Sequence, residues 1–275
     1  MRGTAAHTPH GPAFHLTRQY DWSCLSSPAF RDIDPESTIA ILPTAAIEQH
    51  GPHLPVGTDT LINEGMLEEL RRTCPDDLDI RILPVQAVGK SNEHLWAPGT
   101  LTLSAETALR VWCDIGLSVA RAGVRKIVIA NSHGGNLDLI SILARELRVR
   151  AGMLAVKCQW GNFGHPEGLY SDHERAFGIH GGDVETSLML AFRPDTVEMS
   201  QAQDFRSTAE TTPISPIGPI SYGWIASDLN PHGVVGNAAA ATRDKGVATC
   251  AHQVAGFIGL LRDVRSMAVP KDLDD

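Results

Sequence analysis

The sequence predicts an α/β protein in which a parallel sheet lies between helix layers. Two observations lead to this prediction. Short apolar runs rich in β-branched residues alternate along the chain with longer amphipathic stretches, and this strand–helix order is typical of parallel sheets. Clusters of polar residues and glycines follow the ends of several runs, which is where open α/β sheets place their functional sites.

Hydrophobic periodicity predicts where these elements lie. Strands are expected over residues 38–42, 80–85, 126–130 and 153–159. Helices are expected over residues 59–72, 105–122, 137–150, 183–192 and 240–264. Asp59 or Thr60 is suited to cap the first helix, and Gly123 is suited to stop the second. Gly246 marks a weak point or a boundary in the last helix.

The bulk composition bounds the class of protein. A chain of 275 residues with 43% apolar residues can build a full hydrophobic core. The formal charge of −9, without a long basic run, argues against nucleic acid or an anionic membrane as a partner. No apolar stretch reaches the roughly 18 residues of a membrane-spanning helix, so no span is expected.

The termini and the cysteines suggest how the chain is organised. Residues 1–20 lack the apolar region of a secretory signal and are expected to form a flexible tail. A single domain is expected over residues 21–265, followed by a C-terminal tail over residues 266–275. The chain has 5 cysteines and no C-x-x-C pair, which fits reduced thiols in the cytoplasm.

The segment from Glu48 to Asp59 (EQHGPHLPVGTD) combines two carboxylates and two imidazoles with several glycines and prolines. Proline lacks an N–H and glycine favours other backbone shapes, so a rigid loop after the first strand is expected instead of a helix. Glu48, His50 and Asp59 carry the oxygen and nitrogen ligands that divalent metals accept, and an Asp is able to bridge two metals. The alternative is a connecting loop with solvated charges.

Two further polar segments precede predicted helices. Asn131 to Asn136 (NSHGGN) places His133 on a tight turn whose small neighbours let a ligand approach the backbone. A plain left-handed turn with a solvated histidine is the alternative. The segment after His180 (HGGDVETS) carries Glu185, while the acidic residue Asp183 is explained equally well as a partner of the helix dipole.

Two other groups of residues have weaker assignments. Glu93 and His94, within a polar segment from Gly89 to Thr100, are expected either to orient metal ligands or to play a structural role. Aromatic residues in or near the late loops are expected to line a substrate pocket, with core packing as the alternative. They are Trp160, Tyr222 and Trp224. The loop from Thr211 to Gly236 lacks periodicity, and such long loops are commonly functional.

Taken together, the strand-end segments predict a two-metal hydrolase site. At this point the chain resembles the creatininase (creatinine amidohydrolase) family. The matching motifs begin with EQHGPHLP at residues 48–55 and Asp59, and continue with G-x-S-x-E-H at 89–94 and PGT at 98–100. They end with N-x-H-G-G-N at 131–136 and H-x-G-x-x-E-T-S at 180–187, so that the resemblance spans roughly residues 36 to 265.

The resemblance implies a three-layer αβα sandwich with a mostly parallel central sheet. It also implies two divalent metal ions per chain (Zn, Mn or Fe), hydrolysis of small non-peptide or cyclic amides, and a homo-oligomer that is frequently a hexamer. By position, Glu48 and His133 would hold one metal and His50 the other, with Asp59 between them. His180 and Glu185 would be the catalytic pair, with Glu185 either a metal ligand or the proton shuttle.

One departure from the family pattern concerns the second metal. Creatininase proper has Tyr-Glu after the motif histidine, and that glutamate binds metal, whereas this chain has Gly134 and Gly135. Glu185 is therefore expected to supply the missing carboxylate. The same departure argues against creatinine itself as the substrate, because relatives with Gly-Gly include formamide hydrolases and the peptidase-like maturase of mycofactocin.

The function predicted from the sequence is metal-dependent hydrolysis of a small amide, formamide or lactam, with hydroxide supplied by a water shared between the two metals. A non-catalytic metal-binding relative and a mycofactocin-type peptide-maturing hydrolase are the alternatives. A nucleotide-binding protein is disfavoured because no G-x-x-x-x-G-K or G-x-G-x-x-G motif is present. A serine hydrolase is disfavoured because no G-x-S-x-G turn occurs.

Overall fold

The structure is a computed structural model that describes residues 19–271. Most of the tail predicted over residues 1–20 lies outside this range, as do residues 272–275 of the predicted C-terminal tail. Within the described range the last residues contact the domain, since the Val269 N–H donates to Glu36 and the Arg148 guanidinium donates to the Lys271 carbonyl.

A four-stranded sheet forms the centre of the molecule, with all neighbouring strands parallel and the order β2-β1-β3-β4. The strands are β1 (Thr38–Thr44), β2 (Asp79–Ile82), β3 (Lys126–Asn131) and β4 (Leu154–Gln159). In the register of the sheet, Thr44 pairs with Asn131, and Asn131 pairs with Gln159. The carboxyl ends of three strands therefore lie in one row, and the loops that leave them meet at one edge.

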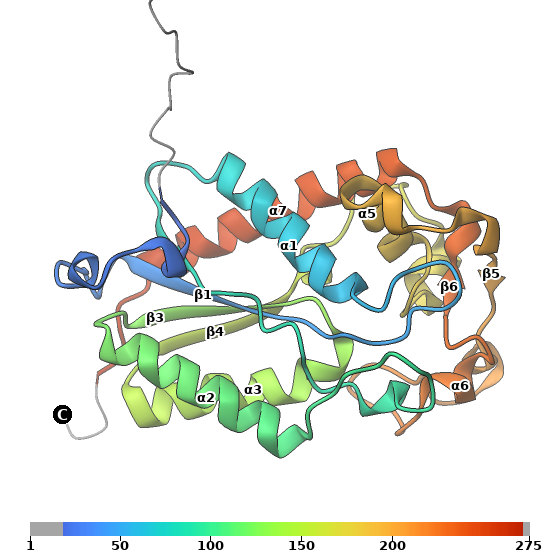
Figure 1. Cartoon of the computed structure of the whole chain (residues 1–275), viewed down its shortest axis with the longest axis horizontal. Coiled ribbons are helices and arrows are strands. Elements are labelled where there is room, and N and C mark those ends of the chain that lie inside the picture. Colours follow the sequence, from blue (N-terminus) through green and yellow to red (C-terminus); the bar gives the residue numbers. More distant parts are fainter. Residues whose placement is uncertain (1–18, 272–275) are drawn as a thin grey trace, which may run out of the picture.

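Helices cover both faces of this sheet, as Figure 1 shows. One face carries α1 (Thr58–Thr73), α5 (Asp183–Phe192) and α7 (Arg243–Ser266), and the other carries α2 (Ala105–Arg121) and α3 (Leu137–Ala151). Because successive side chains of a strand point to opposite faces, Ile39 and Ile41 enter one hydrophobic core while Ala40 and Leu42 enter the other. The predicted three-layer sandwich with a parallel sheet is confirmed.

The remaining elements gather beyond the carboxyl ends of the strands. They are the short helices α4 (Asp172–Phe177) and α6 (Ala226–Leu229), and the antiparallel strands β5 (Asp204–Phe205) and β6 (Gly236–Asn237). In Figure 1, α6, β5 and β6 lie at the right of the molecule, beyond the end of β1. The loop predicted over residues 211–236 is largely irregular and joins these elements. They close over the sheet edge from which the polar loops emerge.

Two details of the helices differ from the prediction. The first helix begins at Thr58 after Gly57, so Asp59 lies within its first turn and the expectation that Asp59 or Thr60 caps it is wrong. The last helix continues through Gly246. A Cβ atom at this position would lie 1.9 Å from the Ser187 carbonyl oxygen. Glycine at this position is what lets α7 approach α5. Among the helices of the described range, none is long and apolar enough to cross a membrane.

Candidate metal centre

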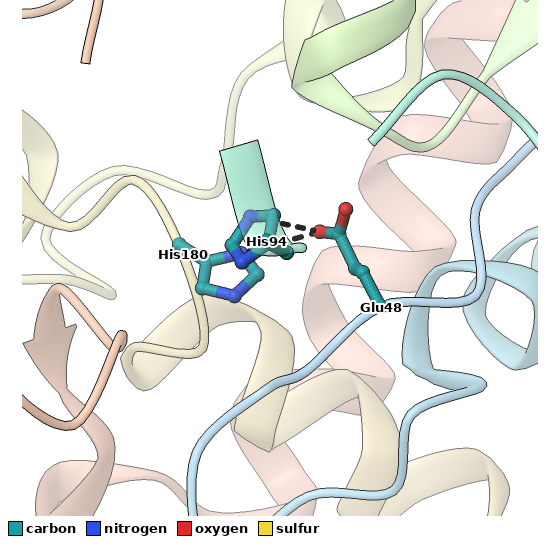
Figure 2. Close-up of side chains that lie close together, drawn as sticks. All are labelled: Glu48, His94 and His180. Carbon is teal, nitrogen blue, oxygen red and sulfur yellow. Dashed lines mark ion pairs between the residues drawn. The ribbon is translucent and has the colours of Figure 1, made fainter. Parts of the chain in front are cut away.

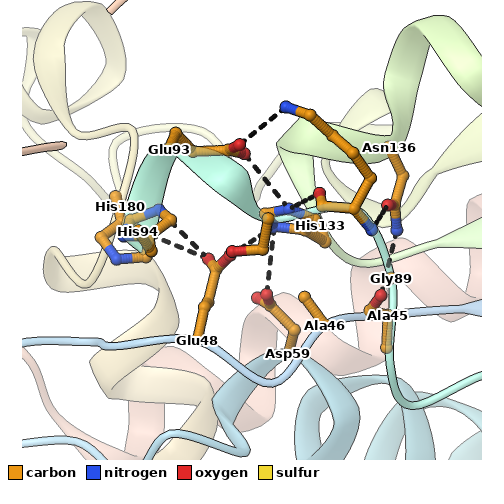
Figure 3. A network of polar contacts seen from close by, with 12 residues as sticks. Ala45, Ala46, Glu48, Asp59, Gly89, Glu93, His94, His133, Asn136 and His180 are labelled. Carbon is orange, nitrogen blue, oxygen red and sulfur yellow. Dashed lines mark hydrogen bonds and ion pairs between the residues drawn. The ribbon is translucent and has the colours of Figure 1, made fainter. Parts of the chain in front are cut away.

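The six residues predicted as ligands or catalytic groups lie together at the carboxyl edge of the sheet. Figure 3 shows Glu48, Asp59, His133 and His180 among them. Glu48 and His50 come from the loop after β1, and Asp59 comes from the first turn of α1. His133 follows β3, and the other two predicted residues, His180 and Glu185, lie just before and within the first turn of α5. Strand register thus brings segments more than 130 residues apart in the sequence into one site.

The first group of potential ligands surrounds His133. Its Nδ1 lies 3.2 Å from Glu48 Oε2 and 3.2 Å from Asp59 Oδ2. Ser91 Oγ donates a hydrogen bond to Glu48 Oε2 and holds that carboxylate in place. One oxygen of each carboxylate thus lies near His133 Nδ1, and carboxylate oxygens and imidazole nitrogens are ligands that divalent ions accept.

The second group surrounds His50. Its Nε2 lies 3.5 Å from Asp59 Oδ1 and 3.8 Å from Glu185 Oε2, while its Nδ1 faces the Glu48 carbonyl oxygen at 3.2 Å. Asp59 thus turns one carboxylate oxygen toward His133 and the other toward His50. A carboxylate shared in this way is suited to lie between two metal ions.

Three buried atoms of this cluster have no hydrogen-bond partner among the described residues: Glu48 Oε1, His50 Nε2 and Asp59 Oδ2. The three side chains are at most 1% exposed. Buried polar groups in native proteins nearly always have partners, and leaving one unpaired costs on the order of 1–3 kcal/mol. Their convergence fits a site that is completed by divalent cations, because carboxylate oxygens and imidazole nitrogens are the ligands these ions prefer.

The pKa values of the cluster also fit a metal-binding site. Burial opposes charge on His50, yet the carboxylates of Asp59, Glu185 and Glu48 outweigh it and raise the pKa of His50 to about 9. The pKa of His133 is likewise raised well above its usual value, while the facing histidines hold the pKa of the buried Asp59 far below its usual range. Without metal, protons on the histidines balance the carboxylates. Metal binding at such a site releases those protons.

Glu185 and His180 differ from these ligands in their pKa values. Burial raises the pKa of the Glu185 carboxyl to about 7, although its side chain is 24% exposed toward the cavity. Burial, together with the neighbouring His50 and His94, holds the pKa of His180 well below its usual value. Near neutral pH, His180 is therefore an uncharged imidazole and Glu185 exchanges a proton readily. These are the properties of groups that move protons.

Glu93 and His94, expected either to orient metal ligands or to play a structural role, both lie against the predicted ligands. His94 Nε2 lies 3.6 Å and His180 Nδ1 lies 3.5 Å from the same oxygen, Glu48 Oε1. Figure 2 shows the two rings next to each other on one side of this carboxylate. Glu93 Oε1 lies 3.4 Å from His133 Nε2, and its other oxygen lies 2.7 Å from Lys90 Nζ. A Cβ atom at Gly135 would lie 2.0 Å from Glu93 Oε1, so glycine leaves room for this carboxylate.

A cavity of about 570 Å³ opens onto the cluster. Glu48, His180 and Glu185 line its floor, and the predicted aromatic residues Tyr222 and Trp224 line it from the loop before α6. Trp160, the third predicted aromatic residue, lies elsewhere. Its ring is 4% exposed, its Nε1 donates to Asn63, and it lines a smaller hollow of about 180 Å³ that shares His180 and Glu185 with the cavity.

An αβα sandwich with carboxylates and histidines gathered at the carboxyl edge of its sheet belongs to the class of α/β proteins built around a metal centre. Residues 23–261 match the family model described as creatininase, creatinine amidohydrolase. The chain therefore belongs to the creatininase family, as the motifs predicted.

Curated relatives share between a quarter and three tenths of their residues with this chain. A mycofactocin precursor peptide peptidase from Mycolicibacterium smegmatis is 26% identical over 236 residues, covering 85% of this chain and 88% of the relative. A creatinine amidohydrolase from Pseudomonas putida is 28% identical over 242 residues, covering 82% and 89%. The family hydrolase predicted from the sequence is confirmed, while its substrate differs among these relatives.

Solved structures share the fold. A creatininase with a single tryptophan-to-alanine substitution superposes with a TM-score of 0.71 at 24% identity, covering 91% of this chain and 100% of the other. A structure titled "Creatininase Mn" (TM-score 0.67, 23% identity) and a glutamate-to-glutamine variant described as the Zn-Zn type (TM-score 0.68, 23% identity) each cover the same shares. Metal-containing structures of this fold thus include manganese and zinc forms.

Proposed function

We propose that this chain hydrolyses the C–N bond of a small amide, formamide or lactam at a centre of two divalent metal ions. The observation that carries this proposal is the cluster of Glu48, His50 and Asp59, each with a buried atom that lacks a partner (Oε1, Nε2 and Oδ2), next to a cavity that Glu48 and Asp59 line. Buried polar atoms nearly always have a partner in native proteins, and bound metal ions would supply the partner here.

Two sets of residues would hold the metals. Glu48, Asp59 and His133 form one set, and His50, Asp59 and Glu185 form the other. When bound, zinc, manganese or iron supplies a hydroxide near neutral pH and polarises the carbonyl group. No side chain leaves Gly135, and the room beside it holds Glu93, which lies with Glu48 and His133. In the second set, beside His50, Glu185 would supply the carboxylate.

The chain's own residues handle the protons. Glu185, whose pKa is about 7, is suited to take a proton from the attacking water and to release it again near neutral pH. His180 lies beside Glu185, and its free Nδ1, which faces Glu48 Oε1, is suited to accept the proton that Glu185 takes from the water and to pass it to the leaving nitrogen. Whether Glu185 acts chiefly as a ligand or as the proton shuttle is decided by the metal content of its variants.

The cavity supports a small organic substrate. Its volume of about 570 Å³ falls within the range of ordinary ligand pockets, and Tyr222 and Trp224 offer apolar walls opposite the polar floor. A second candidate function is trimming of a peptide, which the similarity to a mycofactocin precursor peptide peptidase favours. Such a substrate would place only its terminal residues in the cavity.

The experiment that tests the proposal begins with metal content. Purified protein supplied with zinc, manganese or iron should hold two ions per chain, and Glu185→Ala should hold about one. His133→Ala should lose both metal and activity, and His180→Ala should keep its metal while turnover falls. Exposed Glu167→Ala is the matched control and should behave as the wild type.

A substrate screen completes the test. Lactams, formamides and cyclic ureas are compared with short peptides whose terminal amide bonds are assayed separately. Turnover of the first group with no cleavage of peptides supports the amidohydrolase, and the reverse supports peptide trimming. Fewer than two metals at saturation would overturn the two-metal centre. Two metals with no turnover of any amide would leave a non-catalytic metal-binding relative.

We also propose that the chain acts in the cytoplasm, which its 5 cysteines without a C-x-x-C pair fit, and that its domain spans residues 21–265. From the family resemblance we expect a homo-oligomer, with a hexamer as the expected form. Light scattering on the eluting protein measures the oligomer directly. A truncated chain of residues 21–265 should fold and bind metal like the full chain, and a truncated chain that fails to fold would contradict these limits.

A further inference from the structure

Gln49 lies between two of the proposed ligands, Glu48 and His50, yet its side chain turns toward the loop around Gly233. Its Oε1 accepts from the Gly51 N–H at 2.8 Å, and its Nε2 donates to the Gly233 carbonyl at 2.7 Å. The reversed amide would set two donors against each other at Gly51 and two acceptors against each other at Gly233. The two backbone partners therefore determine which end of the Gln49 amide is the donor.

This orientation determines the tautomer of His94. The Nδ1 atom of His94 lies 3.0 Å from Gln49 Nε2 in the buried interior. Since Gln49 Nε2 carries hydrogens and has no lone pair to offer, His94 Nδ1 must be the acceptor. A neutral imidazole has one protonated nitrogen, so the hydrogen of His94 lies on Nε2, the atom that faces Glu48 Oε1.

The backbone of the same residue gives His180 the same tautomer, but there the unprotonated nitrogen faces Glu48. Its Nε2 lies 2.8 Å from the Gln49 carbonyl oxygen, which is only able to accept. His180 therefore carries its hydrogen on Nε2, and its Nδ1 is left as a free lone pair 3.5 Å from Glu48 Oε1. The two rings lie against each other with centroids 4.3 Å apart, so one donor and one acceptor stand side by side at the cavity floor.

Spacing alone would group Glu48, His94 and His180 as a metal site, because their potential ligand atoms lie within 4.8 Å of one another (Figure 2). A protonated nitrogen offers no lone pair to a metal. We propose that Gln49 is a positioning residue that sets His94 as an N–H donor of the site, excluded from the metal ligands, while it leaves His180 as an acceptor. What that donor acts on rests on the proposed function.

In amide hydrolysis the group that gains charge is the carbonyl oxygen of the substrate. A donor fixed in advance in a buried wall stabilises that charge, and loss of one such donor typically lowers turnover by about 10²–10³-fold. His94 is 2% exposed and is held by Gln49 and by the Thr100 hydroxyl, which donates to the His94 carbonyl. The direction of the His94 Nε2–H is therefore fixed before substrate binds, as stabilisation of the substrate carbonyl oxygen requires.

The test reads the tautomers directly. In zinc-loaded protein labelled with ¹⁵N-histidine, long-range proton–nitrogen correlation spectra distinguish protonated from bare ring nitrogens. The wild type should show His94 protonated on Nε2 and His180 protonated on Nε2. In Gln49→Glu the new carboxylate accepts from His94 Nδ1, so the His94 hydrogen should move to Nδ1. Gln49→Met, which leaves no donor, should show both forms of His94.

Metal content and rescue separate a donor from a ligand. His94→Phe should keep the zinc content of the wild type while turnover on the amide found by the substrate screen falls by about 10²–10³-fold. His94→Gln retains an N–H and should recover part of that loss at unchanged zinc content. Gln201→Glu, the same change on an exposed side chain, and His173→Phe, on a histidine outside the cavity, are the matched controls.

Two results would overturn the proposal. One is a wild-type His94 protonated on Nδ1, and the other is the loss of zinc from His94→Phe. Neither measurement requires turnover, so a failure of the proposed hydrolysis is seen separately. A protein that shows the expected tautomers and zinc content but hydrolyses no amide would contradict the proposed function and leave the assignment of Gln49 intact.

Discussion

Two buried clusters of carboxylates lie on either side of the start of α5, and they are built in opposite ways. At the metal centre, Glu48 and Asp59 each keep a buried oxygen without a hydrogen-bond partner among the described residues. In the second cluster, formed by Glu174 and Asp183, every carboxylate oxygen has a partner. Both clusters are at most 3% exposed, so burial alone does not separate them.

The second cluster is made by close approach of the backbone. Glu174 accepts from the N–H groups of Asp183 at 2.7 Å and Asn237 at 2.8 Å. A Cβ atom at Gly178 or Gly182 would lie within 2.3 Å of its carboxylate, so the glycines make room for it. The carboxylate ties α4 to the start of α5 and to β6, which holds in place the loop that carries His180.

The comparison teaches how to tell a structural carboxylate from a functional one. Backbone donors that surround a buried carboxylate stabilise the fold and leave the oxygens nothing else to bind. Buried oxygens that face a cavity without partners destabilise the metal-free fold and are ready to receive an ion. Activity and stability measurements should therefore respond in opposite ways in the two clusters.

The largest effect is expected on turnover, from a substitution at the metal centre. Glu48→Gln removes one ligand oxygen, and a loss of about 4 kcal/mol of transition-state stabilisation corresponds to roughly a thousandfold lower turnover. Metal content should fall together with turnover. In the presence of a chelator, Glu48 Oε1 has no hydrogen-bond partner to lose, so the stability of the metal-free protein should change less than in Glu174→Gln. Metal analysis, steady-state kinetics and thermal melting measure the three quantities.

Glu174→Gln is the matched control for that experiment. The same chemical change there turns an acceptor into a donor that faces a backbone N–H, and the melting temperature should fall while metal content is kept. If Glu48→Gln destabilised the metal-free protein as much as Glu174→Gln, the contrast between the two clusters would be wrong.

A somewhat smaller effect is expected on stability, from a substitution beside the cluster of Glu174 and Asp183. Lys245 Nζ lies 2.5 Å from Asp183 Oδ2, and Lys245→Met would leave that carboxylate buried without its cation. Breaking a buried pair from one side costs about 3–5 kcal/mol, which lowers the melting temperature by on the order of 10 °C in a chain of this size. Adding Asp183→Asn should recover part of the loss.

The exposed pair of Arg110 and Glu106 provides the control, because Arg110→Met should cost less than about 1 kcal/mol. A Lys245→Met protein that melts with the wild type would mean that Asp183 is compensated by other groups. Metal content is expected to be unchanged in all of these variants.

The smallest effect concerns His53, a histidine of the first motif that serves the fold. Its ring is 1% exposed, and its Nε2 donates to the Gly181 carbonyl at 3.0 Å. Burial lowers the pKa of His53 to about 4, against about 6.5 in the unfolded chain. The unfolded chain thus binds the proton first, and stability should fall by up to about 3 kcal/mol as the pH drops from 6.5 to 4.

His53→Gln keeps a donor for the Gly181 carbonyl but does not titrate. Chemical denaturation in the presence of a chelator, repeated across this pH range, should show a shallower loss of stability for the variant than for the wild type. Parallel curves for the two proteins would contradict the assignment of His53 as a buried neutral imidazole.

The sequence by itself determined the layers of the fold and most of the candidate site. Apolar runs with β-branched residues predicted the strands because both faces of a parallel sheet are buried, and each run was followed by polar loop residues. Glu48, His50, Asp59, His133, His180 and Glu185 were named from their motifs, and all of them meet at one edge of the sheet. The strand pattern and the loop motifs can be read from the sequence because they depend on residues that are neighbours along the chain.

Only the tertiary structure decided what each polar side chain faces. From the sequence, Trp160 could either line a pocket or pack in the core. The structure buries it with its Nε1 donating to Asn63, at the edge of the smaller hollow that also borders His180 and Glu185. Gln49 and His94 lie 45 residues apart, and their contact and the tautomers it imposes follow from the closing of two loops over the sheet edge. Contacts between segments that are far apart in the sequence decide the direction of hydrogen bonds, the close approach at glycines and which atoms lack partners. No local pattern of the sequence records such contacts.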